Sequence, residues 1–202
     1  MTNKEILIFV EGPSDRFFLE IYLLYLYFQE KFPIKNFKVQ NIKGKDNLSK
    51  RLLEIEKYDK TLIIFDADKD YESNKKEILK VVSKTKQTIS EEQIFLFPNN
   101  QDDGDLETLL LEIAKYDEFL KCFEGYLECI KNKEHYKPIK NIRKNMLYAY
   151  LEVFGLENLT KTDGKDKIKE KHKEEYEKLK EVIDFSLNSL IPLKNFLGQF
   201  AK

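Results

Sequence analysis

Unbroken apolar runs alternate, along the first half of the chain, with longer stretches whose apolar residues recur at helical spacing. The apolar runs predict strands buried on both faces, and the periodic stretches predict helices. We expect strands at residues 6–10, 37–42, 61–65 and 93–97. We expect helices at residues 15–31, 48–58, 73–86 and 106–115. This alternating order predicts an α/β, Rossmann-like fold: a mostly parallel four-stranded sheet with helices on both faces.

The second half of the chain has a mainly helical pattern. Helices are expected at residues 117–131, 139–154 and 186–200. Pro192 interrupts the apolar stripe of the last of these. Lysines and glutamates dominate residues 161–180, which predicts a solvated loop and an exposed helix, and residues 182–185 could form a short edge strand. We therefore expect an α/β core at residues 1–115 and a helical C-terminal extension, residues 116–202, packed on the same domain.

Composition changes this picture little. The 35 basic and 36 acidic residues nearly cancel, so net charge identifies no partner. Residues 17–28 are almost wholly apolar but fall short of the roughly 20 residues that span a bilayer. They predict a helix buried on most sides, or one partly buried in a homodimer.

Without a secretory signal, and with Cys122 and Cys129 too far apart along one helix to bridge, we expect reduced thiols and a cytoplasmic protein.

Carboxylates follow two of the predicted buried strands. Glu11 comes directly after the first strand, before a turn and a helix opened by Ser14 or Asp15, and Asp66 and Asp68 follow the third strand. Because the carboxyl ends of parallel strands meet at one edge of a sheet, these four acids are expected to converge. Glutamate is a poor helix cap and an unusual end for a buried strand, which favours a functional role for Glu11.

Clustered carboxylates repel one another unless a cation neutralises them, and an all-oxygen site suits Mg²⁺ or Mn²⁺. We expect one or two ions. Asp70 could contribute to a second site, as could the acids of the later loop and helix, which are Asp102, Asp103, Asp105 and Glu107. Taken singly, Asp15 and Asp105 could be helix caps, and Asp68 and Asp70 could be turn formers.

The segment Glu11-Gly12-Pro13-Ser14-Asp15, followed by Asp66-Ala67-Asp68 after a later strand, resembles the Toprim domain of topoisomerases, bacterial primases and OLD-type nucleases. The resemblance covers about residues 5–115. It implies that Glu11 is a metal ligand or proton-transfer residue, that Asp66 and Asp68 are metal ligands, and that Asp15 is the second acid of the OLD-like version.

The whole chain also resembles small stand-alone, OLD-nuclease-like Toprim proteins of prokaryotes whose function is undetermined. Residues 44–47, 97–100 with 104–107, and 183–185 with 192–197 carry this second resemblance. OLD-type nucleases also use a lysine beyond the DxD segment to stabilise charge on phosphate, which makes Lys144 and Lys140 candidates here. The alternative for both lysines is a solvated helix face.

A basic cluster follows the second predicted strand and leads toward the same sheet edge. Its members are Lys43, Lys45, Lys50 and Arg51. Contacts with a nucleic-acid backbone require positive charge and little sequence specificity, so we expect these residues to bind phosphates. A solvated turn is the alternative.

Together these features predict a metal-dependent phosphoryl-transfer enzyme that acts on nucleic acid, most simply a nuclease, with DNA ranked above RNA as its substrate. The competing interpretation is a Toprim module without catalysis of its own, which binds metal and nucleic acid or a nucleotide, or needs a partner. A phospho-accepting receiver domain ranks low, because the strand at residues 93–97 is followed by Pro98 and not by a hydroxyl residue.

Overall fold

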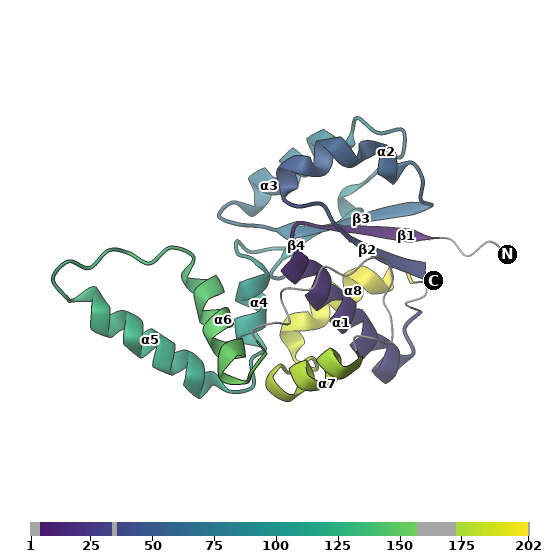
Figure 1. The fold of residues 1–202 in the computed structure, drawn as a ribbon. Helices are drawn as coiled ribbons and strands as arrows, with labels where there is room; N and C mark the ends of the chain where they lie inside the picture. Colours follow the sequence, from purple (N-terminus) through teal and green to yellow (C-terminus); the bar gives the residue numbers. More distant parts are fainter. Residues whose placement is uncertain (1–4, 34–35, 157–172, 202) are drawn as a thin grey trace.

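The protein forms a four-stranded parallel sheet, as predicted (Figure 1). The computed structural model describes residues 5–33, 36–156 and 173–201. The strands are β1 Ile6–Val10, β2 Phe37–Asn41, β3 Lys60–Asp66 and β4 Ile94–Phe97. Their order across the sheet is β2-β1-β3-β4, and every neighbouring pair is parallel. Such a sheet needs cover on both faces, which explains the uninterrupted apolar strands.

Helices cover both faces of the sheet (Figure 1). One face packs on α2 (Leu52–Ile55) and α3 (Tyr71–Val82). The other packs on α1 (Pro13–Glu30) and α4 (Leu106–Glu112), and on helices from the second half of the chain. The two apolar cores are separated by the sheet, because side chains alternate along each strand. The α/β, Rossmann-like prediction is therefore confirmed.

The second half of the chain builds on the α1 face. Its helices are α5 Asp117–Lys131, α6 Ile142–Val153, α7 Lys173–Val182 and α8 Ile191–Gly198. Helix α6 packs against α4, α7 packs against α1, and the ring of Phe196 in α8 lies 5.4 Å from that of Phe95 in β4. These helices share one apolar core with the sheet, whereas α5 has no buried residue and extends outward beside α6 (Figure 1).

Local details differ from the sequence predictions. Helix α1 begins at Pro13 with Gly12 as its cap, not at Ser14 or Asp15, since proline suits the first helical turn. Residues 182–185 form no strand: the only pairing described there is an isolated antiparallel bridge between Ala114 and Ile183. Pro192 lies in the first turn of α8, which begins at Ile191, and does not interrupt the helix.

Two more predictions need adjustment. The helix expected at residues 48–58 is a 3-10 helix, Lys45–Arg51, followed by the single turn of α2. Most of the charged stretch predicted at residues 161–180 lies outside the described residues, and its end forms α7.

The apolar segment of α1 is mostly buried within the chain. Leu19, Ile21 and Leu23 are 0% exposed, whereas Tyr27 and Phe28 near the end of the helix are 42% and 47% exposed. Burial inside the protein therefore accounts for most of its apolar character, and the homodimer stays a prediction. None of the helices in the described part of the chain is long and apolar enough to cross a membrane, and Cys122 and Cys129 are free and exposed.

Candidate active site

The carboxyl ends of β1 and β3 bring Glu11 and Asp66 together. In the sheet, Val10 is opposite Ile64, so the residues that follow lie side by side. The backbone N–H of Asp66 donates a hydrogen bond to Oε1 of Glu11 at 3.1 Å. The predicted convergence of these two acids at one sheet edge is thus present in the structure.

Asp15 and Glu107 complete an acidic wall. Asp15 lies in the first turn of α1, 8% exposed, and its Oδ2 accepts the Gly12 N–H at 2.7 Å. Glu107 lies in the first turn of α4, and the N–H of Leu106, its neighbour, donates to Oδ1 of Asp66 at 2.9 Å. The starts of α1 and α4 therefore hold the acids of two helices beside the acids of two strands.

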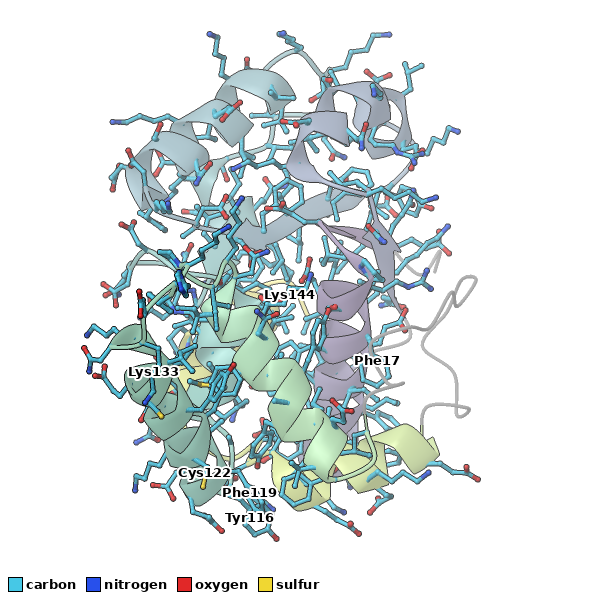
Figure 2. All side chains as sticks on the ribbon, turned by 60° about the vertical axis from the view of Figure 1, so that its left-hand side comes forward. Phe17, Tyr116, Phe119, Cys122, Lys133 and Lys144 are labelled. Atoms are coloured by element: carbon cyan, nitrogen blue, oxygen red, sulfur yellow. The ribbon has the colours of Figure 1, made fainter. Side chains whose placement is uncertain are left out.

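This acidic wall faces a cavity of about 690 Å³. Glu11, Asp15, Asp66 and Glu107 line it on the side of the sheet, together with Gly12, Pro13, Ser14 and Gly44. Lys144, Tyr148 and Glu152 of α6 also line it. Figure 2 shows Lys144 near the end of α6 that is closest to the sheet, with α1 alongside. The cavity is therefore bounded by the α/β core and by the helical extension.

The acids of this wall hold their protons more tightly than free carboxyl groups do. Burial raises the pKa of Glu11 to about 7, and the charges of Asp15 and Asp68 add to the increase, against the hydrogen bond from Asp66 that lowers it. Burial, with the charges of Asp15 and Glu11, raises the pKa of Asp66 to about 9. The ionised cluster is therefore unfavourable without a compensating cation.

The remaining two acids, Asp15 and Glu107, also have raised pKa values. Burial raises the pKa of Asp15, which lies within the influence of the positive charge of Lys144. Burial also raises the pKa of Glu107, to which the charges of Asp105 and Asp15 contribute, while Lys144 opposes them. Lys144 thus acts electrostatically on the acidic wall, although it comes from a different part of the fold.

Asp68 and Asp70 point to other partners. Oδ2 of Asp68 accepts a hydrogen bond from Nζ of Lys45 at 2.7 Å, and its carboxylate is 51% exposed. Oδ1 of Asp70 accepts the Ser73 N–H at 2.9 Å and caps α3. Neither residue lines the cavity. Asp70 therefore caps a helix, whereas a turn former was its expected structural alternative, and Asp68 remains near enough for its charge to affect Glu11.

The acids of the loop before α4 also make structural hydrogen bonds. Oδ1 of Asp105 accepts the Thr108 N–H at 2.8 Å and caps α4. Oδ1 of Asp103 accepts the Tyr71 N–H at 2.8 Å, and Oδ2 of Asp102 accepts Nδ2 of Asn99 at 2.8 Å. Among the acids considered for a second ion, Glu107 is the one that lines the cavity.

The predicted basic cluster divides among several partners. Lys45 contacts Asp68 and, at 2.9 Å, Oδ1 of Asn74. Nζ of Lys50 donates to Oδ1 of Asn47 at 2.9 Å, and Nη1 of Arg51 lies 2.6 Å from Oε1 of Glu54. Nucleic-acid binding by these residues stays a prediction.

Lys43 shapes the loop that ends at the cavity. Its backbone has a φ of 62°, and the next residue, Gly44, has a φ of 101° and lines the cavity. The Gly44 N–H donates to the carbonyl of Glu11 at 2.8 Å, which fixes this loop beside the end of β1. The other candidate lysine, Lys140, does not line the cavity.

Sequence reasoning missed Tyr148, Glu152 and Asn74. Tyr148 and Glu152 follow Lys144 at intervals of four residues, the spacing of one helix face, so the pattern could have indicated them once Lys144 was chosen. Asn74 donates from Nδ2 to the Ala67 carbonyl at 2.6 Å and so holds the loop after β3. Nothing in the sequence pattern indicated this contact.

The oxygen-rich wall is chemically suited to Mg²⁺ or Mn²⁺, but its side chains are not drawn into a ready-made coordination cage. Across the described residues, no group of three or more His, Cys, Asp or Glu side chains is arranged to hold a metal ion. The hydrogen bonds to Glu11, Asp15 and Asp66 each use one carboxylate oxygen. The second oxygen of each carboxylate lies outside these three bonds.

Residues 5–200 match the family model described as "Protein of unknown function (DUF3226)", and the chain therefore belongs to that family. Searches of curated proteins and of solved structures found no match. The family match names neither an activity nor a Toprim domain, so the Toprim resemblance stays a hypothesis.

Proposed function

We propose that this member of the DUF3226 family is a divalent-cation-dependent hydrolase of nucleic-acid phosphodiesters, with DNA ranked above RNA as substrate. One observation carries the proposal: four buried or half-buried acids with raised pKa values share a cavity with a lysine from another part of the fold. A cluster of this kind suits a polyanionic substrate only when cations accompany it. Structural ion pairing alone does not explain four acids facing one cavity.

Glu11, Asp15, Asp66 and Glu107 would hold Mg²⁺ or Mn²⁺, as one or two ions. When bound, the ion would supply charge neutralisation at the phosphate and acidify a water molecule. The resemblance to OLD-type nucleases assigns Asp68 to the same set, where the ion would compete with Lys45 for Oδ2 of that carboxylate. The Toprim assignment itself belongs to this proposal.

Side chains of the protein would transfer the proton and offset the negative charge. Hydrolysis forms a bond between a water oxygen and phosphorus and breaks the bond from phosphorus to the leaving oxygen, which gains a proton. Glu11 would either hold the ion or, if the other acids hold it, accept the proton of the attacking water. Lys144, across the cavity, would offset negative charge on the phosphate.

A second function has one observation in its favour. The ammonium of Lys45 already neutralises Asp68, which is half of the predicted DxD pair. A module that binds metal and nucleotide, and cuts only with a partner, would retain such a pair in its resting form. The free thiols of Cys122 and Cys129 fit a reducing compartment, so we place either function in the cytoplasm.

The test is to incubate purified protein with single-stranded DNA, duplex DNA and RNA in Mg²⁺ or Mn²⁺. Wild type should cut at least one of them, and Glu11→Gln and Asp66→Asn should abolish cutting. Asp117→Asn is the matched control, because Asp117 is an exposed acid on α5 that pairs with Lys121. Equal cutting by all four proteins would reveal a contaminant.

Calorimetric titration with Mn²⁺ separates the two functions. Mn²⁺ binding without cutting supports the binding module. If wild type neither binds Mn²⁺ nor cuts, the metal site is contradicted altogether.

A further inference from the structure

Helix α6 contributes one face to the cavity. Lys144, Tyr148 and Glu152 are each four residues apart, so they lie along one side of the helix. The neighbouring residues Leu147 and Leu151 point into the apolar core, at 2% and 4% exposure. The helix is therefore amphipathic in a specific sense: one side packs on the fold and another lines the cavity.

Tyr148 is not a core residue. Its ring is half-buried and lines the cavity, whereas Tyr150, two positions on, is 2% exposed and donates its hydroxyl to the Val182 carbonyl at 2.6 Å. An aromatic ring placed at a cavity offers a flat apolar surface to whatever enters. In proteins that bind single-stranded nucleic acid, such rings stack on bases.

Tyr148 and Lys144 form one unit. Nζ of Lys144 lies 5.6 Å from the centre of the Tyr148 ring, and its charge acts on Asp15 and Glu107. The ring and the ammonium are thus adjacent on α6, opposite the acidic wall. A nucleoside phosphate has the same two parts, a flat base and an anionic group, joined by a sugar.

We propose that the cavity takes an unpaired nucleoside phosphate, with its base on Tyr148 and its phosphate between Lys144 and the acidic wall. This rests on the proposed function, since the acidic wall accepts a phosphate only with accompanying cations. The volume of about 690 Å³ falls within the roughly 300–1,000 Å³ of pockets that enclose small ligands. A base inside a duplex is already covered on both faces by its neighbours, so the substrate class is a single strand, a frayed end or a free nucleotide.

The test measures binding of a short fluorescein-labelled single-stranded DNA by fluorescence anisotropy in Mg²⁺, repeated in Ca²⁺ to check that cutting does not consume the probe. Tyr148→Leu should weaken binding by about five- to hundredfold, the usual loss when a stacking ring is removed. Tyr148→Phe keeps the ring and should stay within about twofold of wild type. Tyr126→Leu is the control, because Tyr126 is 53% exposed on α5 and does not line the cavity. Circular dichroism confirms that each variant is folded.

Competition with unlabelled ligands distinguishes the sources of the nucleotide. Strong competition by a mononucleotide indicates a free nucleotide as ligand, and competition by single strands alone indicates a strand terminus; either supports the proposal. Binding of duplex as tight as that of single strand, with Tyr148→Leu equal to wild type, overturns it.

The proposed function fails separately. If the protein binds no Mn²⁺ and cuts nothing, yet Tyr148→Leu still weakens nucleotide binding, the acidic site and the phosphate position are wrong and only the stacking of the base on Tyr148 stands. If Mn²⁺ binding and cutting depend on Glu11 but not on Tyr148, the reverse holds.

Discussion

The ammonium of Lys45 lies 2.7 Å from Oδ2 of Asp68, the second acid of the pair at the carboxyl end of β3. The same ammonium contacts Asn74, whose amide holds the carbonyl of Ala67 between the two acids. The loop after β3 is therefore fastened to the loop after β2 by a cation that belongs to the chain. Any other cation that binds Oδ2 of Asp68 must therefore compete with Lys45.

Replacing Lys45 with methionine should tighten Mn²⁺ binding by about two- to fivefold, the range expected when a half-exposed ion pair no longer competes. Isothermal titration calorimetry measures this change. Lys50→Met is the control, since Lys50 contacts Asn47 and not an acid of the site. Weaker Mn²⁺ binding in Lys45→Met would show that Lys45 supports the site and does not compete with it.

The raised pKa values predict a stability that falls as the pH rises. Below about pH 4.5, Glu11 is protonated in the folded and unfolded states and contributes no penalty; between 4.5 and about 7 the unfolded chain ionises first, so the free energy of unfolding decreases. Asp66 extends this window, from 3.8 to about 9. Asp66→Asn keeps an acceptor for the Leu106 N–H, and in EDTA near pH 8 it should be more stable than wild type by about 1–3 kcal/mol.

Thermal unfolding of both proteins across this pH range tests the prediction. The stability difference should shrink toward pH 4, and Mg²⁺ should reduce it near pH 8 by stabilising wild type. Asp117→Asn serves as the exposed control. A variant less stable than wild type throughout would mean that the Asp66 carboxylate is favourably compensated within the protein itself.

The capping role of Asp70 can be separated from metal binding. Asp70→Ala removes the acceptor for the Ser73 N–H and should lower the free energy of unfolding by about 0.5–2 kcal/mol. Asp70→Asn can still cap α3 and should unfold close to wild type in urea. Both variants should bind Mn²⁺ as wild type does, because Asp70 does not line the cavity. Loss of Mn²⁺ binding in Asp70→Asn would restore Asp70 to the metal site.

Gly104 is required at the loop before α4. Its φ is +145°, and an added Cβ would lie 3.0 Å from both Cδ of Pro98 and Oγ1 of Thr108. Gly104→Ala should therefore destabilise the protein by about 1–3 kcal/mol, as measured by urea unfolding. Gly125→Ala is the matched control: Gly125 lies within α5 with no atom near the added Cβ, so this change should stabilise by about 0.5–1 kcal/mol. Equal stability of the two variants would contradict the strain assigned to Gly104.

The sheet could be predicted from sequence because its signal is local. The runs at residues 6–10 and 61–65 are wholly apolar, or nearly so, and only a sheet covered on both faces needs such strands. The 3-10 helix at Lys45–Arg51 could not be distinguished from an α-helix, because a few apolar residues fit either period. The bridge between Ala114 and Ile183 was mistaken for an edge strand, since a short apolar pair has the same pattern in both cases.

The candidate site, like the fold, could be predicted from the sequence only in part. Glu11 and Asp66 follow buried strands, so topology alone placed them side by side. The destination of Lys45 depended on how two loops approach each other, and no periodicity encodes that distance. Tyr148 lies in a helix whose pattern shows that one side is polar but not what that side faces.

The two walls of the cavity come from distant parts of the chain, so they are synthesised at different times. The four acids come from the ends of β1 and β3 and from the first turns of α1 and α4, all of which leave the ribosome before α6. Until α6 follows, the four acids lack the lysine and the tyrosine that face them. A nascent chain stopped after α4 would hold the charges of the site without the chamber, and the second half of the molecule determines when that chamber first exists.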